Sequence, residues 1–476
     1  MNTELLVDLK RMNRLLLIIS TAITLTFIGC GQNGQEKEFD QAAAADPGLY
    51  HWAVTDLSDI MVHDIFSPPV ASRVYVYPNI AAYEVIAAAY PDRFQSLAGQ
   101  LTDLTPTPAI PADQEIFAPL AASQAFLRLK RALVFSEDKI QAFEDQFFQK
   151  YQEFGVSETV LNNSKAYGDQ VADHILAWSG RDNYKQTRTF PSYSVNDHKG
   201  RWVLTPPDYM AAIEPHWNKI RPFVIDSATQ FVPVRPTKID MRKGSNFYKE
   251  MMEVYDVVKN RTDETAEIAE FWDCNPFATE HIGHVMYAVK KITPGGHWIG
   301  ICGIACEKAG LDFPETVAAY AYTSITIADA FISCWDEKYR SNYIRPETVI
   351  NEHVDKEWRP LLQTPPFPEY TSGHSVVSAS AATVLTDFFG DNFAFNDTTE
   401  LQFDLPARSF TSFKQASEEA AVSRLYGGIH YMPAIDNGVE QGRRVGNYIV
   451  GNLNLRKGKD QSDATAELET TETTNQ

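Results

Sequence analysis

The chain has 476 residues, 44% of them hydrophobic and 12% aromatic, so it can bury a large core and hold one big domain or about two to three ordinary ones. Acidic side chains outnumber basic ones by 62 to 42, which gives a formal net charge of -20. A general attraction to nucleic acid or anionic lipid is therefore not expected, and any anion site must be a local cluster of cations.

A signal peptide is predicted over residues 1–29. Basic residues at 10, 11 and 14 precede an apolar run at 15–28. The run is too short to span a bilayer as a helix and suits a secretory signal, whether the chain starts at Met1 or at Met12. It ends in Gly29-Cys30, which resembles the bacterial lipobox. We expect export to the cell envelope or outer surface as a lipoprotein, with Cys30 lipidated. The alternative is an ordinary signal peptide or membrane anchor, giving a periplasmic or secreted protein.

Both ends of the exported chain are expected to lack packed structure. Residues 30–48 begin with a polar, glycine-containing run that has nothing to bury, so a flexible tether is predicted there. The last residues, 457–476, are rich in Glu and Thr and are predicted to be disordered. The folded body is then expected over residues 49–456.

This body has the sequence pattern of helices. Apolar residues recur at three- and four-residue spacing in segments 59–63, 79–89, 117–134, 139–154, 158–178, 245–259, 264–271, 314–335, 375–389, 412–426 and 436–453. Residues 74–77 resemble a strand in composition, but Pro78 follows, and we favour a helix kinked at Pro78 over an edge strand. Prolines predict irregular structure at 184–236 and 364–370. Without a repeat or composition break, we predict an all-α fold with a single large helical domain.

The cysteines place little constraint on the fold. Four cysteines lie in the body: Cys274, Cys302, Cys306 and Cys334. Export permits disulfides, but a chain of this size does not depend on them. We expect free buried thiols or at most one bridge.

Three short stretches near the C-terminal end carry the chemistry. They are Lys338 with Arg345-Pro346, Ser372-Gly373-His374, and Ser423-Arg424 with His430. Together they offer three permanent cations, a hydroxyl, two histidines and a glycine that lets a ligand approach the backbone. This is the inventory needed to hold a tetrahedral oxyanion.

Each stretch is expected at the end of a helix. Lys338 and Arg345 are about two helical turns apart, so both cations are expected on one side of a helix that stops near the following proline. Ser372 opens the next helix, where free N–H groups and the helix dipole favour an anion. Arg424 lies near the end of another helix. A bundle of these helices would bring the three stretches together.

None of these stretches is specific alone, as a second Arg-Pro pair at Arg359-Pro360 shows. Their order and spacing together resemble the three-part signature shared by the vanadium-dependent haloperoxidases and the type 2 phosphatidic acid phosphatases, whose pockets are built around vanadate or phosphate. The stretch at 67–73 is similar to bacterial haloperoxidase members. The resemblance implies a helical-bundle core of that superfamily with vanadate as the cofactor.

Carried over residue by residue, the resemblance implies a vanadate site. The residues that would bind the ion are Lys338, Arg345, Ser372, Gly373, His374, Arg424 and His430. Of these, His430 would bond to the vanadium, the three cations would neutralise its oxygens, and Ser372 and Gly373 would donate hydrogen bonds. His374 would be the acid and base, and Lys338 would polarise the oxidant. His374, Lys338 and His430 would thus be catalytic, converting a halide and hydrogen peroxide into a hypohalous acid that halogenates organic acceptors.

Two departures from the signature bear on the chemistry. Thr371 stands where a proline usually precedes the Ser-Gly-His motif. Ala434 stands where the phosphatases have the aspartate that orients their nucleophilic histidine, and Asp436 comes two residues later. We expect Asp436 to be the N-cap of the last helix, which weakens the phosphatase interpretation; a loop that restores it to the histidine is the alternative.

Two aromatic residues near the motifs bear on the halide. Trp335 lies three residues before Lys338 and Phe367 lies seven before His374, at positions that vary in this family with the halide oxidised. Phe367 resembles the chloroperoxidase arrangement, but the bacterial exported members most similar to this chain resemble iodoperoxidases. Iodide is the easiest halide to oxidise, so we favour it. Ordinary core packing of both rings is the alternative.

Glu280-His281-x2-His284 with His297 could suggest a second metal site. The two histidines are three apart on an expected helix and lack a third ligand at the usual spacing, so a structural role is favoured.

Two other hypotheses stay open beside the haloperoxidase. One is an exported acid phosphatase that uses His430 as its nucleophile, and the other is a surface lipoprotein that binds a ligand without chemistry. The organic acceptor and the oligomeric state stay open. Nucleic acid is not expected as a partner, and membrane contact is expected only through the lipid anchor.

Overall fold

A computed structural model describes residues 38–195 and 198–458, and helices dominate these residues. The expected signal peptide, Cys30 and the residues after 458 lie outside the described part of the chain. The α-helices are α2 (Gln41–Ala44), α3 (Pro47–His63), α4 (Pro68–Ala89), α5 (Ala118–Leu133), α6 (Glu137–Glu153), α7 (Glu158–Ser179), α8 (Tyr184–Thr187), α9 (Asn246–Lys259), α10 (Asp263–Phe271), α11 (Pro294–Ala309), α12 (Phe313–Ser341), α13 (Pro346–His353), α14 (Gly373–Phe389), α15 (Phe413–Tyr426) and α16 (Met432–Asn452). The short 3-10 helices are η1 (Trp217–Lys219) and η2 (Leu401–Phe403).

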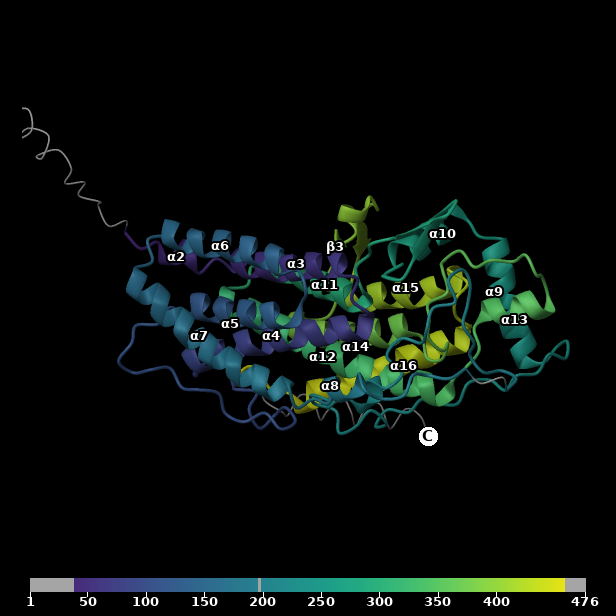
Figure 1. Ribbon diagram of the computed structural model, residues 1–476, viewed down its shortest axis with the longest axis horizontal. Coiled ribbons are helices and arrows are strands. Elements are labelled where there is room, and N and C mark those ends of the chain that lie inside the picture. Colours follow the sequence, from purple (N-terminus) through teal and green to yellow (C-terminus); the bar gives the residue numbers. More distant parts are fainter. Residues whose placement is uncertain (1–37, 196–197, 459–476) are drawn as a thin grey trace, which may run out of the picture.

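The strands form two small antiparallel hairpins. Strand β1 (Thr279–Ile282) pairs with β2 (Val285–Ala288), and β3 (Phe395–Asp397) pairs with β4 (Arg408–Phe410). Their register places Thr279 opposite Ala288 and Phe395 opposite Phe410. The β3–β4 hairpin follows α14 and precedes α15 in the sequence, and it projects from the top of the helical body (Figure 1). The all-α prediction is therefore confirmed, with the strands confined to these insertions in the part that the structure describes.

Helix α12 is the axis of the molecule. All residues from Thr316 to Lys338 are buried, as is typical of a helix that is apolar on every side and sits in a core. Helix α12 is long and apolar enough to cross a membrane, but its apolar segment is wholly buried inside the protein. Helix α4 packs on it from the N-terminal half of the chain, and α14 and α16 pack on it from the C-terminal half.

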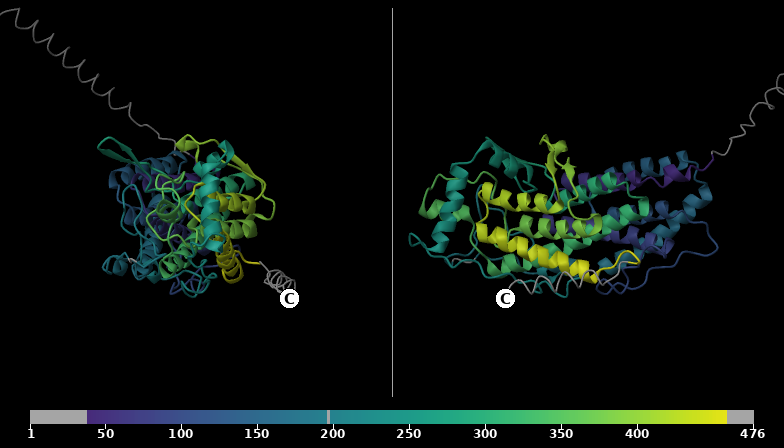
Figure 2. Two further views of the ribbon diagram at one scale, coloured as in Figure 1. Left: turned by 90° about the vertical axis from the view of Figure 1, so that its right-hand side faces the viewer. Right: turned by 180° about the vertical axis from the view of Figure 1, so that it is seen from behind.

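The helices form two groups that share this axis. One group is α4, α5 and α7, and the other is α14, α15 and α16. Front and back views show both groups running along the long axis of the body (Figures 1 and 2). A single apolar core, from Tyr50 of α3 to Ile449 of α16, runs through both groups. The three sequence stretches lie at the ends of α12, α14 and α15, with Arg345 at the start of α13 and His430 just before α16.

Helix α4 continues through Pro78, so residues 74–77 are helical and the edge-strand alternative is wrong. A proline inside a helix cannot donate its backbone hydrogen bond. The side chain of the next residue, Asn79, donates to the carbonyl of Tyr75 at 2.8 Å in the same turn. This hydrogen bond satisfies a buried polar group where the helix ladder is interrupted.

Several expected boundaries are wrong. Helix α12 ends at Ser341, where Asn342 takes a left-handed conformation with φ 47, and α13 begins again at Pro346. Lys338 and Arg345 therefore lie on different elements rather than on one helix. Helix α16 begins at Met432, so Asp436 lies inside it and Tyr431 is the N-cap. Helix α11, which carries His297, was not predicted at all.

Two further expectations need correction. The histidines at 281 and 284 lie on the β1–β2 hairpin rather than on a helix. The expected tether at 30–48 is partly packed, because Ala44 is buried in α2 and the backbone N–H of Asp40 donates to the carbonyl of Phe154 at 2.8 Å. The four cysteines of the described chain are free and buried, as expected.

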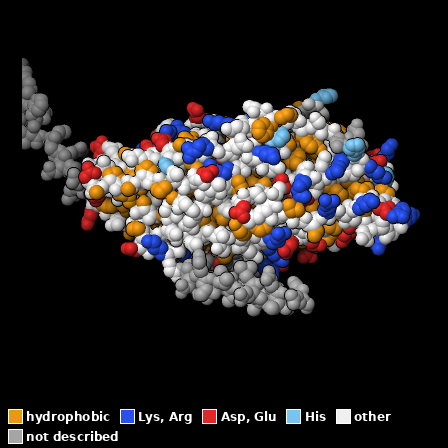
Figure 3. Space-filling model, turned by 90° about the horizontal axis from the view of Figure 1, so that it is seen from below, with side chains coloured by type: hydrophobic (Ala, Val, Ile, Leu, Met, Phe, Trp, Pro, Cys, Tyr) orange, Lys and Arg blue, Asp and Glu red, His pale blue; other side chains and the backbone are white. Residues whose placement is uncertain are grey.

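Side chains of both signs cover the surface. On the face drawn in Figure 3, acidic, basic and apolar side chains are interspersed.

Candidate active site

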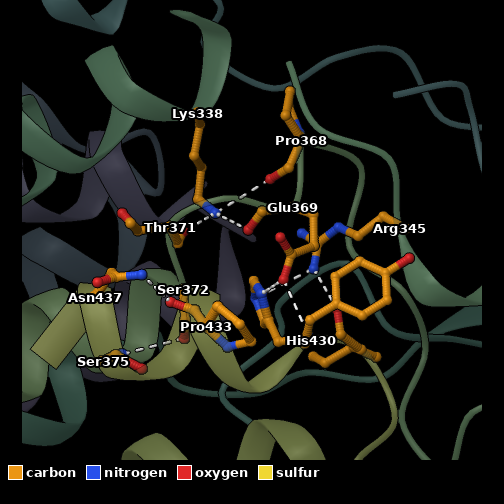
Figure 4. A network of polar contacts seen from close by, with 12 residues as sticks. Lys338, Arg345, Pro368, Glu369, Thr371, Ser372, Ser375, His430, Pro433 and Asn437 are labelled. Carbon is orange, nitrogen blue, oxygen red and sulfur yellow. Dashed lines mark hydrogen bonds and ion pairs between the residues drawn. The ribbon is translucent and has the colours of Figure 1, made fainter. Parts of the chain in front are cut away.

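Lys338 lies in the last turn of α12 with its ammonium group held by backbone oxygens. Its Nζ donates to the carbonyls of Pro368 at 3.1 Å, Glu369 at 3.2 Å and Thr371 at 2.5 Å (Figure 4). The side chain has no exposed surface, and burial lowers its pKa to about 7. The three carbonyls fix the position of the ammonium group but carry no charge that offsets it.

Arg345 is the residue before α13 and reaches across to the segment that precedes α16. Its Nε donates to the carbonyl of Phe367 at 3.0 Å and its Nη1 to the carbonyl of Ile429 at 2.8 Å. The same Nη1 lies 3.2 Å from Nε2 of His430. Burial lowers the pKa of this guanidinium to about 10, so it stays charged at neutral pH. Its Nη2 is buried and lacks a hydrogen-bond partner.

The Ser-Gly-His stretch opens α14, as predicted. Ser372 is the N-cap, and its hydroxyl accepts from the N–H of Ser375 at 3.3 Å. A Cβ on Gly373 would lie 3.7 Å from the Trp335 ring and 3.9 Å from Cε of Lys338, so this backbone passes close to both. Nε2 of His374 is buried without a partner. Burial and then the charge of Arg424 lower the pKa of His374 well below its usual value, which keeps the ring neutral.

Arg424 lies near the end of α15, as predicted, and is tied to the end of α10. Its Nη2 donates to the carbonyls of Trp272 at 2.7 Å and Ala269 at 3.2 Å. Its Nε donates to the hydroxyl of Ser423 at 2.9 Å. The carbonyls of α10 therefore aim this buried cation.

His430 is held by a carboxylate that was not predicted. Its Nδ1 lies 2.8 Å from Oε1 of Glu369, and the backbone N–H of Tyr431 donates to the same oxygen at 3.0 Å (Figure 4). Because the guanidinium of Arg345 can only donate, Nε2 of His430 accepts from its Nη1 and is unprotonated, and the Nδ1–H of His430 donates to Glu369. Burial and the charge of Arg345 lower the pKa of His430 well below its usual value.

Glu369 is wholly buried, and burial raises its pKa to about 8, against the opposing charges of Arg345 and Lys338. Glu369 orients His430, which is the role that was considered for Asp436. The side chain of Asp436 is exposed on α16. The expected N-cap role of Asp436 is also wrong, because Tyr431 is the N-cap. Pattern reading missed Glu369 because it lies in a proline-rich loop without periodicity. Its one signal was a carboxylate three residues before Ser372.

A small cavity of about 30 Å³ lies between these groups, room for about two water molecules or a compact ion. Its lining includes Trp335, Phe367, Gly373, His374, Arg424 and His430. The centres of the Trp335 and Phe367 rings are 5.0 Å apart, and Nζ of Lys338 lies 5.0 Å from the centre of Phe367. A larger hollow of about 660 Å³ between α14, α15 and α16 contains none of these residues.

The pocket fits a tetrahedral oxyanion. Three buried cations lie at or beside it: Arg424 lines the cavity, Lys338 lies next to Gly373, and Arg345 contacts His430. Glu369 can offset at most one of these charges, and Asp273, which lies toward Arg424, is paired with Lys291. Nη2 of Arg345 and Nε2 of His374 are buried without hydrogen-bond partners. A buried cation whose N–H group lacks a partner, as Nη2 of Arg345 does, needs a bound acceptor, and the unpartnered Nε2 of the neutral His374 is free to accept a proton from a ligand. Of the residues predicted to hold vanadate, Gly373, His374, Arg424 and His430 line the cavity, and Lys338, Arg345 and Ser372 lie next to them.

Thr371, which stands where the family signature usually has a proline, helps to hold the loop before α14 in place. Its hydroxyl donates to Oε1 of Gln441 at 2.7 Å, and its carbonyl accepts from Lys338. Gln441 in turn donates to the hydroxyl of Ser333 at 3.0 Å. These buried hydrogen bonds join the loop before α14 to α16 and α12.

Comparison with known proteins agrees with this geometry. Residues 318–456 match the family described as the VCPO second helical-bundle domain. The solved structure of the first bacterial vanadium-dependent iodoperoxidase is similar to 87% of this chain and 99% of its own, with 53% identity and a TM-score of 0.83. No curated protein matches the chain.

More distant structures share the fold. Two structures of bacterial vanadium-dependent chloroperoxidase, one of the holo type and one of the apo type, are 15% and 14% identical to this chain, with TM-scores of 0.61 and 0.60. They match 87% and 80% of this chain and 95% and 93% of their own chains.

Proposed function

We propose that this chain, which belongs to the vanadium-dependent haloperoxidases, uses bound vanadate to oxidise iodide with hydrogen peroxide. The observation that carries the proposal is the buried pocket that joins three cations to a histidine whose Nδ1 is held by a carboxylate. The likeness to a bacterial vanadium iodoperoxidase over nearly the whole of that protein supports it.

The residues present fit vanadate. His430 would bond to the metal through Nε2, since its Nδ1–H is engaged by Glu369. Lys338, Arg345 and Arg424 would neutralise the oxygens, and the hydroxyl of Ser372 and the N–H of Gly373 would donate to them. Bound vanadate would act as a Lewis acid that activates the peroxide without changing oxidation state.

The side chains around the pocket would move protons and exclude water. His374 is neutral in the pocket, so its Nε2 can accept a proton from hydrogen peroxide and return it later. Lys338 and Arg424 would hold negative charge that develops on the oxidant. Trp335 and Phe367 would form an apolar wall beside the halide. The product would be a hypohalous acid or its equivalent, which halogenates nearby organic acceptors.

An assay with matched variants tests this function. The purified protein is incubated with vanadate, hydrogen peroxide and iodide, and then with a phosphomonoester in place of the halide and peroxide. We expect iodide oxidation that requires vanadate, is lost in His430→Ala and Arg345→Ala, and is retained in Arg359→Ala. Arg359 belongs to the exposed second Arg-Pro pair and is the matched control. Phosphate release without iodide oxidation would instead establish the phosphatase alternative.

The preference for iodide is tested with the same protein. Rates with iodide, bromide and chloride are compared at equal concentrations of hydrogen peroxide. We expect the highest kcat/KM for iodide, because it is the most easily oxidised. A higher value for chloride would overturn the iodide assignment and leave the haloperoxidase assignment standing.

We also propose that the enzyme is an exported lipoprotein anchored at Cys30. The support is the sequence alone, because Cys30 lies outside the described residues. The whole precursor is expressed in a bacterium that is fed an alkyne-labelled fatty acid. We expect label in the wild-type protein and in Cys306→Ser, and none in Cys30→Ser. A wild-type protein without label would contradict the anchor.

A further inference from the structure

Behind the active-site cavity, three potential metal ligands from separate parts of the chain meet in the core. Cys274 follows α10, His297 lies in the first turn of α11, and Glu400 precedes η2 in the insertion between β3 and β4. Their ligand atoms all lie within 4.8 Å of one another, and each residue is at least nine-tenths buried. Cys274 also lines the cavity that holds His374 and His430.

The spacing of these atoms suits a tetrahedral zinc ion. Bonds of about 2.3 Å to sulfur and about 2.0 to 2.1 Å to nitrogen and oxygen place S and N about 3.6 Å apart and N and O about 3.3 Å apart. Here Sγ of Cys274 lies 3.4 Å from Nδ1 of His297, and Nδ1 lies 3.1 Å from Oε1 of Glu400. The three atoms are thus placed to share one ion.

The imidazole of His297 is oriented for metal binding. Its Nε2 lies 2.8 Å from Oδ2 of Asp397, whose other oxygen accepts from the N–H and hydroxyl of Thr399. A histidine that donates one N–H to a carboxylate turns the lone pair of its other nitrogen toward a metal. The indole of Trp272 stacks on the ring with centroids 4.5 Å apart and planes 18° apart.

Glu400 adds a buried oxygen that a metal ion would satisfy. Its Oε1 is buried and makes no hydrogen bond of acceptable geometry, although it lies near Nδ1 of His297. A buried carboxylate oxygen without a donor is costly unless it is paired with a cation or coordinates a metal.

We propose that Cys274, His297 and Glu400 bind a zinc ion that fastens the β3–β4 insertion to α11 and to the end of α10. A thiolate, an imidazole and a carboxylate together favour zinc over magnesium or calcium, which prefer oxygen ligands. The ion would also steady the pocket, because Trp272, two residues before Cys274, offers the carbonyl that binds Arg424. This zinc is separate from the vanadate and takes no part in halide oxidation.

Metal content tests the proposal without reference to activity. Whole untagged protein, free of vanadate, is saturated with zinc, dialysed and analysed by mass spectrometry for metal. We expect about one zinc per chain in the wild-type protein and in Cys306→Ser, and a loss of about tenfold or more in zinc affinity in Cys274→Ser and Glu400→Gln. Cys306 is the control because it is a buried cysteine on the same helix as His297.

Cobalt gives a second readout that does not depend on how well the variants fold. Wild-type protein loaded with Co²⁺ should show thiolate-to-cobalt charge-transfer absorption, and added zinc should abolish it. Wild-type protein that retains no zinc and shows no such band would overturn the proposal. Full zinc binding by folded Cys274→Ser would also overturn it.

Discussion

Nδ1 of His430 lies 2.8 Å from Oε1 of Glu369, and both side chains are buried. The carboxylate that orients the metal-binding histidine therefore comes from the loop before α14 and not from α16. Above its pKa of about 8, Glu369 places a charged acceptor at Nδ1, which makes Nε2 a stronger donor to a metal. We predict that Glu369→Gln, which keeps an acceptor oxygen but removes the charge, weakens vanadate affinity by about 10- to 100-fold.

Asp436→Asn is the matched control for that change, because Asp436 lies exposed on α16 close in sequence to His430. Vanadate affinity is measured from the recovery of iodide oxidation as vanadate is added back to the metal-free protein. Asp436→Asn should bind vanadate as the wild-type protein does. Equal losses in the two variants, or no loss in Glu369→Gln, would contradict the assignment of Glu369.

We predict that the binding of an anion is coupled to the protonation of Lys338. In the free protein its pKa is lowered to about 7, first by burial and then by Arg345 against partial compensation from nearby groups. A bound anion favours the ammonium form and raises that pKa, so binding above pH 7 takes up a proton. Affinity should then fall as pH rises through 7, by up to about tenfold per pH unit from this group.

Sulfate is a suitable probe for this linkage because its charge does not change over this pH range. Calorimetric titration at pH 8 in two buffers of different ionisation enthalpy gives the number of protons taken up. We expect uptake in the wild-type protein and less in Lys338→Arg, whose guanidinium is charged throughout. The same uptake in both proteins would assign the proton to another group.

The ring of Phe367 packs against two cations, Lys338 and Arg345. Nζ of Lys338 lies 5.0 Å and Cζ of Arg345 lies 5.2 Å from the centre of its ring. A cation over an aromatic face in a dry site is stabilised by about 1 to 2 kcal/mol. We predict that Phe367→Leu lowers kcat/KM for iodide by about 5- to 30-fold, which is the same energy expressed as a rate.

The control for Phe367→Leu is Phe190→Leu, which changes a partly exposed phenylalanine outside the pocket. Steady-state rates with iodide are compared at a fixed vanadate concentration that saturates both proteins. A variant as active as the wild type would show that the ring is ordinary packing, the alternative considered from the sequence.

The residues of the site could be predicted from the sequence, but their arrangement in space could not. Lys338, Arg345 and His430 were found because residue type and order are visible in the chain. Their relation was not, because the left-handed Asn342 breaks the helix between the first two. Glu369 and Asp329 were missed for a different reason: each is a buried carboxylate whose partners lie about 60 or 100 residues away, and no periodicity marks such contacts. Helix interiors follow local apolar spacing, whereas buried polar contacts depend on the tertiary fold.

Asp329 in the middle of α12 fixes the irregular segment at 223–225. Its Oδ1 accepts from the N–H of Phe223 at 2.7 Å, and its Oδ2 accepts from those of Val224 at 2.7 Å and Ile225 at 3.0 Å. Asp329→Asn would replace one acceptor oxygen by a donor and leave a buried N–H unpaired. We predict a loss of about 1 to 3 kcal/mol in the free energy of unfolding, measured in urea, and no loss in the exposed control Asp226→Asn. Wild-type stability in Asp329→Asn would contradict the role.

The stabilising effect of Asp329 should also depend on pH. Burial raises its pKa to about 6 despite the three hydrogen bonds, whereas the unfolded chain has a value near 4. Between these values the folded protein holds a proton that the unfolded chain has lost, so the contribution of this group to stability falls as pH rises from about 4 to about 6. Asparagine does not titrate. The difference in unfolding free energy between the wild type and Asp329→Asn should therefore be larger at pH 4.5 than at pH 7, by up to about 2 kcal/mol. A difference that is constant with pH, or larger at pH 7, would show that Asp329 is ionised in the folded protein throughout.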